Sequence, residues 1–216
     1  VGPEEMVETA EGFGFNQQVP IDVAGAVASV YPTEFGELLR SPEGENRIGV
    51  YENSPVLAQS GLGQNDVSAS PLQMALVASA VANGGEIMTP HVVQEVRRTD
   101  ASVVHTVAEE AFRTATSPET ALALQQAMRK AVTDGTARGL ALNGIDVGAK
   151  TGTAQLGEAG VSAHAWVIGF AGDPGFPAEV VFAIHVEADA ENPDQSGSRT
   201  AVPIARELLA QYFGVV

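Results

Sequence analysis

The chain has 216 residues and a formal net charge of −16, because 27 acidic residues outnumber 11 Lys and Arg. Its 44% hydrophobic content is too apolar for a disordered tail, and its length suits one domain with a substantial core. The negative charge disfavours nucleic acid and anionic membrane surfaces as partners, since both are bound through clustered Lys and Arg. The absence of cysteine from the sequence excludes disulfides, thiolate catalysis and Cys-ligated metals.

The first third of the chain is predicted to hold one helix and a long segment of loops. Residues 2–7 favour the start of a helix, because Pro and acidic residues occupy its first turn, and the helix is expected to end near residues 12–14. Residues 16–64 carry scattered Pro and Gly without a sustained period, which indicates loops and short helical turns. Within them, residues 42–46 are acidic and are expected to form a solvated tip.

Two further helices have clear start signals. Residues 71–82 predict a buried helix, because a Ser-Pro pair precedes a nearly unbroken apolar run that Asn-Gly-Gly ends. Residues 118–133 predict a second one, with a Ser-Pro-Glu start and an Asp-Gly end. Between these helices, residues 91–98 and 102–107 indicate a small hairpin.

The last third of the chain predicts strands and a final helix. Short turns favour antiparallel pairing of three candidate strands, Val147–Gln155, His164–Ala171 and Glu179–Val186. A helix over about residues 200–212 then places Ile204, Leu208 and Tyr212 on one face. Trp166 and Phe170 share a strand face that we expect in the core. This order of elements predicts an α/β (α+β) fold of layered helices and antiparallel strands.

The strongest local candidate for chemistry is the segment Gly148–Gln155. In a strand, Lys150 points to one side while Thr151 and Thr153 share the other, and Gly152 lets another backbone approach closely. Two hydroxyls beside a cation suit a carboxylate, and a free strand edge suits an extended peptide or an oxyanion. An ordinary glycine-containing strand with a surface lysine explains the segment equally well.

Several stretches in the same order resemble the class B penicillin-binding proteins, the monofunctional peptidoglycan transpeptidases. Lys150-Thr151-Gly152 is one of the three signatures of penicillin-recognising serine enzymes. The stretches that resemble the family are Gly61–Ala75 (with SPLQMA), Ala82–Gly85, Met128–Ala137, Ala165–Ala171 and Pro203–Arg206. The resemblance implies the penicillin-binding-protein/β-lactamase-like transpeptidase fold, and it is thin before Gln59.

The other two signatures of the family do not occur in this sequence. Ala127 and Val147 stand three residues before the two lysines, Lys130 and Lys150, so there is no Ser-x-x-Lys. No asparagine follows a serine at the spacing of Ser-x-Asn either. Because both signatures precede SPLQMA in the family, we expect residues 1–216 to be the C-terminal part of the transpeptidase domain.

The resemblance implies a D-Ala–D-Ala transpeptidase that works through a serine acyl-enzyme and binds penicillin. Lys150 would supply positive charge, and Thr151, Gly152 and Thr153 would bind the terminal or β-lactam carboxylate. The backbone N–H of Thr153 would form half of the oxyanion hole. With the nucleophilic serine absent from the sequence, this chain alone is expected to be inactive.

No cofactor or metal is expected. The histidines show no ligand spacing, and His185 is predicted to be a satisfied or surface residue of its strand. The acids after the last strand, Glu187, Asp189, Glu191 and Asp194, are interpreted as a solvated loop in preference to a calcium site.

Two other functions compete with a transpeptidase part. One is an inactive penicillin-binding-like module that holds peptide or muropeptide, and the other is a β-lactam hydrolase relative. The SPLQMA segment favours a transpeptidase over a hydrolase. The resemblance leaves a septal, elongation or sporulation role open.

The resemblance also implies partners and a location. The family sheet has five strands, two of them from upstream, so strand 179–186 would have a bare apolar edge. We expect this edge to meet the missing half of the domain or a second copy of the chain. The other implied partners are peptidoglycan stem peptides, β-lactams and cell-wall synthesis proteins, at the extracytoplasmic face of the bacterial cytoplasmic membrane, with an anchor upstream.

Overall fold

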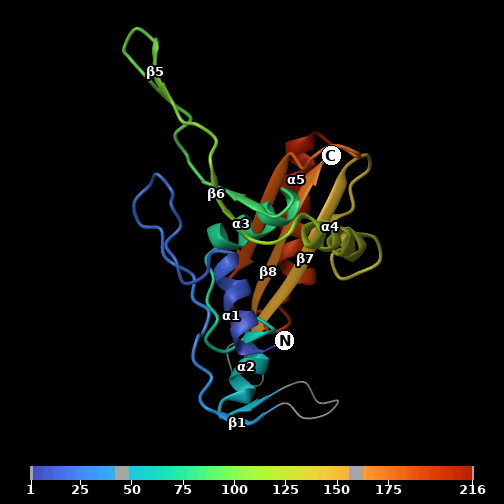
Figure 1. Ribbon diagram of the computed structural model, residues 1–216. Coiled ribbons are helices and arrows are strands. Elements are labelled where there is room, and N and C mark those ends of the chain that lie inside the picture. Colours follow the sequence, from blue (N-terminus) through green and yellow to red (C-terminus); the bar gives the residue numbers. More distant parts are fainter. Residues whose placement is uncertain (1, 42–48, 156–162, 216) are drawn as a thin grey trace.

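The computed structural model of the chain describes residues 2–41, 49–155 and 163–215. The acidic tip expected at residues 42–46 lies outside the described residues. Figure 1 shows a long twisted sheet with helices packed around it and a hairpin that projects away from the body. The predicted class of layered helices and antiparallel strands is confirmed.

The main sheet consists of β7 (Asp146–Gln155), β8 (Ala163–Gly172) and β9 (Val180–Val186). The strands pair antiparallel in the order β7-β8-β9, with Gly152 opposite Trp166. The three predicted strands are therefore confirmed. Within the described part of the chain, β7 and β9 are the two edges of this sheet.

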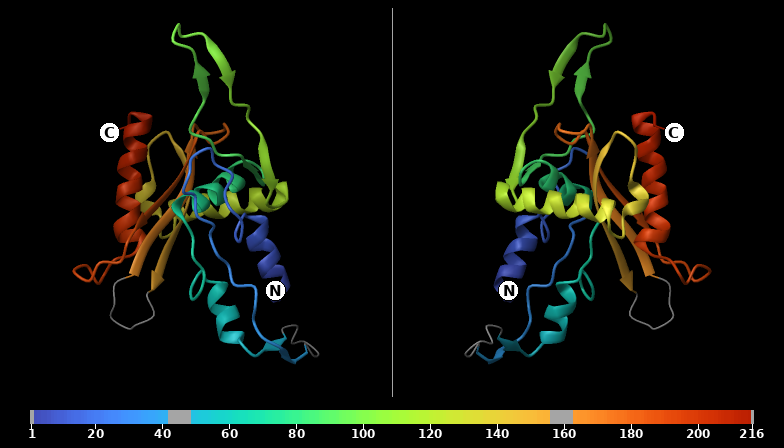
Figure 2. Two further views of the ribbon diagram at one scale, coloured as in Figure 1. Left: turned by 90° about the vertical axis from the view of Figure 1, so that its left-hand side faces the viewer. Right: turned by 90° about the vertical axis from the view of Figure 1, so that its right-hand side faces the viewer.

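Helices cover both faces of the sheet (Figure 2). On one face, α5 (Val202–Phe213) packs Ala205 and Leu209 into the same buried cluster as Val167 of β8. On the other face, Phe170 of β8 packs with residues of α3 (Pro71–Ala82) and α4 (Pro118–Thr133). Side chains alternate along the strands, so each face has its own apolar layer.

The predicted helix starts are present as side-chain caps. The Ser70 hydroxyl accepts a hydrogen bond from the N–H of Gln73 at 3.1 Å, and the Ser117 hydroxyl accepts one from the N–H of Thr120 at 3.2 Å. These caps satisfy N–H groups that the first turn of a helix leaves unpaired. The N-terminal helix α1 (Pro3–Gly12) is also present, and it ends within the predicted region.

The final helix has an unexpected surface. Ile204, Leu208 and Tyr212 do share one face of α5, but their exposed fractions are 42%, 53% and 57%. The buried face lies on the other side of the helix and carries Ala205 and Leu209. A short π-helical turn, η2 (Gly197–Ala201), precedes α5 and was not predicted.

The hairpin of β4 (Glu95–Arg97) and β5 (Val103–Thr106) confirms the predicted one with shorter strands. Figures 1 and 2 show that it projects from the body. A second pair of strands, which was not predicted, lies at its base: β3 (Glu86–Met88) with β6 (Ala111–Thr114). In the loop-rich segment, the structure adds two strands and a short helix: β1 (Leu38–Arg40), β2 (Val50–Tyr51) and α2 (Ser54–Ser60).

Of the helices that the structure describes, none combines the length and the apolar composition needed to cross a lipid bilayer.

Candidate functional site

The strand edge of β7 brings the predicted site residues together. Lys150 and Thr153 are exposed on this strand, and Thr151 and Gly152 are partly exposed. Because β7 is an edge of the sheet among the described residues, one side of its backbone has no strand partner there. Such an edge can accept an extended peptide through main-chain hydrogen bonds.

The backbone of Thr153 faces the open side of this edge. Its carbonyl oxygen accepts a hydrogen bond from Nε2 of Gln64 at 3.2 Å, so it points away from β8. In an antiparallel pair, the N–H and C=O of one residue point to the same side of the strand. The N–H of Thr153 therefore also points away from β8, where an N–H can meet a ligand oxygen.

A mostly apolar cavity of about 280 Å³ lies against this part of β7. Its wall includes Lys150, Gly152 and Thr153 together with Trp166 and Ile168 of β8. Gly152 packs closely on Trp166, because a Cβ at position 152 would lie 3.2 Å from the Cβ of Trp166. Trp166 is therefore a wall of the cavity and is only partly buried, whereas its strand neighbour Phe170 lies in the core as predicted.

The two threonine hydroxyls are held from outside the strand. Oγ1 of Thr151 lies 2.7 Å from Oγ1 of Thr136, in the loop after α4. Oγ1 of Thr153 accepts a hydrogen bond from the N–H of Gly197 in η2, at 3.4 Å. These contacts fix two hydroxyls on the side of β7 opposite to Lys150, and hydroxyls can donate to a carboxylate.

The Lys150 side chain folds onto its own strand, where its ammonium group donates a hydrogen bond to the carbonyl oxygen of Thr151. Its side chain is exposed, so it places a positive charge beside the cavity. The predicted cation, the two hydroxyls and an outward N–H are thus gathered within four consecutive residues of one edge strand.

Three residues at the site were not identified from the sequence as contacts. Gln64, Thr136 and Gly197 meet β7 through hydrogen bonds that span 89, 15 and 44 residues of sequence. Gln64 and Thr136 stand in stretches that resemble the family, and that resemblance was the available signal. Gly197 stands outside those stretches, and nothing in the sequence marks it as a contact.

Gln73, in the SPLQMA stretch, has a structural role away from the edge of β7. It is buried, with 1% of its surface exposed, and its Nε2 donates to the carbonyl of Phe13 at 2.7 Å. Its Oε1 has no hydrogen-bond partner among the residues that the structure describes. Gln73 therefore joins α3 to the end of α1 and does not reach the β7 edge.

His185, which was predicted to be a hydrogen-bonded or a surface residue, is partly buried and hydrogen-bonded. Its ring stacks on Trp166 with centroids 4.2 Å apart, and its Nε2 lies 3.2 Å from Nδ1 of His164. Burial lowers the pKa of His185, the positive charge of His164 lowers it further, and Glu187 opposes both effects. Nδ1 of His164 also accepts a hydrogen bond from the N–H of Ala188 at 3.2 Å.

The acids after β9 do not assemble a metal site in the described part of the chain. No group of three or more His, Cys, Asp or Glu side chains there has the geometry to hold an ion. Asp189 accepts the N–H of Glu191 at 2.9 Å, as in a local turn.

The chain is similar over most of its length to known proteins of one family. A family model described as the penicillin binding protein transpeptidase domain matches residues 1–210. The peptidoglycan D,D-transpeptidase PbpA of Mycolicibacterium smegmatis is 34% identical over 168 residues, which are 77% of this chain and 34% of that protein.

Solved structures are similar over most of the chain. A ceftriaxone acyl-enzyme complex of penicillin-binding protein A from M. tuberculosis superposes with a TM-score of 0.76 at 28% identity, covering 94% of this chain and 41% of that one. The D,D-transpeptidase domain of a peptidoglycan glycosyltransferase from Eggerthella lenta gives 0.71 at 25% identity, covering 100% and 49%. The chain spans about a third of the length of its curated PbpA relatives, 34% of one and 33% of another.

Proposed function

Because the chain belongs to the transpeptidase family of the class B penicillin-binding proteins, we propose that residues 1–216 are the C-terminal part of a peptidoglycan D,D-transpeptidase domain. The single observation that carries this proposal is the open edge of β7, where Lys150, Thr151 and Thr153 stand beside a cavity. This edge is one wall of the proposed active site. The serine that completes the site is not in the sequence of this chain.

The proposed reaction has two steps. A serine hydroxyl attacks the carbonyl carbon of the D-Ala–D-Ala bond, forming an ester and releasing D-alanine, which takes the proton. An amine of a neighbouring peptidoglycan strand then attacks the ester carbonyl, forming the cross-link and returning the proton to the serine. A β-lactam acylates the same serine when its ring amide opens.

The residues of this chain would bind and orient the substrate. The hydroxyls of Thr151 and Thr153 would donate to its terminal carboxylate, and Lys150 would add positive charge. The outward N–H of Thr153 would stabilise the negative oxygen that forms at the attacked carbonyl. That oxyanion hole needs a second N–H, which would come from the missing serine.

Peptide binding is tested with the single tryptophan of the chain, Trp166, whose ring lies in the cavity wall. We expect a saturable change in its fluorescence on titration with an N-acetylated peptide that ends in D-Ala–D-Ala. Replacing both Thr151 and Thr153 by valine should weaken binding at least about tenfold, because two donors to a carboxylate are lost. The matched control is Thr106→Val on the exposed hairpin. No saturable response in the unmodified chain would overturn the proposal.

Inactivity of the chain alone is tested separately, by mass. Losing the nucleophile removes the acyl-enzyme, so incubation of residues 1–216 with penicillin should give no penicilloyl adduct. A stoichiometric adduct would show that a nucleophile is present in this chain and would contradict the proposed division of the site.

An inactive module that binds peptide or muropeptide is the second candidate. It is favoured by the absence of both Ser-x-x-Lys and Ser-x-Asn from the sequence. Acylation of the full-length gene product by penicillin would support a transpeptidase, whereas peptide binding without acylation would support the module. Rapid hydrolysis of a chromogenic β-lactam by that product would indicate the third candidate, a hydrolase.

A strand partner for β9 is part of the same proposal. Every residue of β9 is partly exposed, and Val181, Phe182 and Ile184 make it apolar. An open apolar edge tends to pair with another strand. We expect it to pair with the missing half of the domain or with a second copy of this chain. Sedimentation of a monodisperse monomer over a wide concentration range would exclude self-pairing.

The proposed location is the extracytoplasmic face of the cytoplasmic membrane, where stem peptides are cross-linked. Cell-wall synthesis proteins are the expected neighbours there. Protease treatment of spheroplasts should digest the domain without lysis; protection until lysis would contradict this location.

A further inference from the structure

One wall of the apolar cavity is formed by residues 61–69, which we call the covering segment. Leu62, Gly63, Val67 and Ala69 of this segment line the cavity, and residues 150–154 line it from β7. The covering segment follows α2 directly and ends two residues before α3. It is therefore a connection between two helices that faces the edge of β7.

Backbone hydrogen bonds attach the covering segment to the body of the protein at two places. The N–H of Gln64 donates to the carbonyl oxygen of Gln59, in α2, at 3.0 Å. Ser68 exchanges two hydrogen bonds with Val30, at 2.8 and 3.0 Å. Between these attachments, Asn65 has a φ of +61°, in the left-handed region typical of turns. A shift of this turn relative to β7 would leave the pairing of Ser68 with Val30 intact.

The side chain of Gln64 reaches from this turn to the edge of β7. Its Nε2 donates to the carbonyl oxygen of Thr153 at 3.2 Å. Gln64 is partly buried by the contact, whereas Leu62, two residues earlier, is 81% exposed. The hydrogen bond therefore holds the turn against the strand, and it does so through a backbone group of the strand edge.

A peptide that pairs with β7 needs the same carbonyl oxygen. In an antiparallel pair, two residues that face each other can exchange both of their backbone hydrogen bonds. A ligand residue whose carbonyl accepts from the N–H of Thr153 therefore directs its own N–H to the carbonyl of Thr153. The amide of Gln64 reaches this oxygen from the side of β7 away from β8, which is the side that the ligand backbone has to occupy.

We propose that Gln64 is an internal competitor, which occupies the carbonyl of Thr153 in the empty site and is displaced when a peptide pairs with β7. The inference rests on the proposed function, because it takes the ligand to be a peptide bound along β7. The exchange replaces one hydrogen bond by another of the same kind, so the ligand gains little from this contact. In return, the strand edge stays covered while the site is empty, which protects it from pairing with other chains.

The first experiment measures ligand affinity by the fluorescence of Trp166 in the variant Gln64→Met. Methionine has a similar length but no hydrogen-bond donor, so the ligand no longer has to break this contact. An N-acetylated peptide ending in D-Ala–D-Ala should bind about two- to threefold more tightly than to the unmodified chain. The matched control is Gln59→Met, which changes an exposed glutamine outside the cavity and should leave the affinity unchanged.

A shorter ligand tests whether the effect runs through the carbonyl of Thr153. N-acetyl-D-alanine has the terminal carboxylate and the carbonyl before it, but it has no N–H beyond that carbonyl to meet Thr153. Its affinity should be the same for Gln64→Met and for the unmodified chain. If the variant binds both ligands more tightly by the same factor, Gln64 obstructs the cavity without competing for the strand edge, and the inference is overturned.

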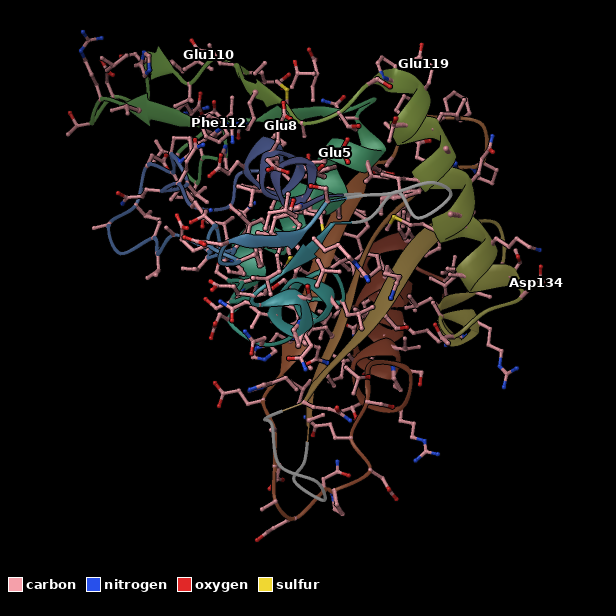
Figure 3. All side chains as sticks on the ribbon, turned by 60° about the horizontal axis from the view of Figure 1, so that its bottom comes forward. Glu5, Glu8, Glu110, Phe112, Glu119 and Asp134 are labelled. Carbon is pink, nitrogen blue, oxygen red and sulfur yellow. The ribbon has the colours of Figure 1, made fainter. Side chains whose placement is uncertain are left out.

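The second experiment follows the covering segment by amide hydrogen exchange with and without the peptide. Saturation with the peptide should slow exchange in β7 and speed it up in residues 61–67, because displacement of Gln64 frees the turn. The internal reference is the start of α4 at Glu119, which Figure 3 shows at the opposite end of that helix from Asp134. Exchange in residues 61–67 that is unchanged or slower on saturation would overturn the inference.

The failure of this inference can be told apart from the failure of the proposed function. If the peptide binds the unmodified chain but Gln64→Met leaves its affinity unchanged or weakens it, Gln64 is no competitor and the β7 site stands. If the peptide does not bind the unmodified chain at all, both are wrong.

Discussion

The hydroxyl oxygens of Thr136 and Thr151 lie 2.7 Å apart and join the loop after α4 to the outer edge of β7. Because Thr151 is one of the proposed carboxylate ligands, this contact sets the direction of a hydroxyl that has to face the substrate. The loop after α4 thereby acts on the site without contacting the apolar cavity.

Replacing Thr136 by valine should affect ligand binding more than stability. The variant keeps the shape of the side chain but removes one hydrogen bond, which contributes about 0.5–1.5 kcal/mol, and here the lower value because Thr136 is exposed to water. The Thr151 hydroxyl then loses its fixed direction, so peptide affinity should fall severalfold in the fluorescence titration. Thr136→Ser keeps the hydroxyl and should behave like the unmodified chain. A valine variant with unchanged affinity would show that the contact has no part in binding.

Glycine at position 197 is expected to be irreplaceable. An added Cβ would lie 2.4 Å from the carbonyl oxygen of Trp166 and 2.6 Å from that of Gly152, and both are backbone atoms of the main sheet. We expect Gly197→Ala to lower the free energy of unfolding by about 1–3 kcal/mol, because overpacking forces the backbone to shift. Urea unfolding measures this loss. Ser198→Ala, in the same turn but exposed, is the control and should be neutral.

Local signals in the sequence were sufficient for the main helices and strands. Ser70 and Ser117 each precede a proline and cap the helix that follows, so α3 and α4 could be placed from a few neighbouring residues. The strands β7, β8 and β9 follow one another in the sequence with few residues between them, which leaves little choice of pairing. The Lys-Thr-Gly signature then indicated the edge on which we propose the site.

Contacts between distant segments were not predictable in this way. The strands β3 and β6 are three and four residues long and pair across the inserted hairpin, so neither has a period to detect. Likewise, nothing near Gly197 in sequence shows that it packs on Gly152. The spacing of Ile204 and Leu208 in the sequence places them on one face of a helix. That spacing alone does not reveal which face of the helix packs on the sheet, and in the structure both residues are exposed.

The ion pair between Arg129 and Asp146 should stabilise the contact of α4 with β7. Nε of Arg129 donates to both carboxylate oxygens, at 2.8 and 3.0 Å, and the guanidinium lies 5.2 Å from the centre of the Phe170 ring. The side chains are 35% and 28% exposed, so solvent screening leaves a contribution of about 1 kcal/mol. Asp146→Asn should lower the free energy of unfolding by that amount in urea.

The control for this pair is Lys130 with Asp134, one residue further along α4. Its side chains are 74% and 65% exposed, and water and salt screen such a pair. Asp134→Asn should therefore give no resolvable change in the same measurement. An equal loss of unfolding free energy in Asp146→Asn and Asp134→Asn would mean that burial does not make the first ion pair stronger than the second.

The free energy of unfolding should decrease as the pH is lowered from neutrality, because of His185. Burial and the neighbouring His164 lower its pKa below the ordinary value of 6.5 in the folded state. Between the folded and the unfolded pKa, the unfolded chain binds more protons, so stability is complete above pH 6.5 and is lost as the pH falls towards the folded pKa. Urea unfolding at about pH 7.5 and about pH 5.5 should show this loss.

His185→Gln is the variant that isolates this effect. Glutamine cannot take up a proton, so the variant should lose the pH dependence in this range even if its stability at neutral pH is lower. The control His105→Gln, on the exposed strand β5, should keep the dependence of the unmodified chain. The pKa of some carboxyl groups is also lowered, as for Asp22, whose ordinary value is 3.8. Such groups change the stability only at lower pH, so they do not contribute to the slope measured here. A slope that persists in His185→Gln would assign the titration to another histidine.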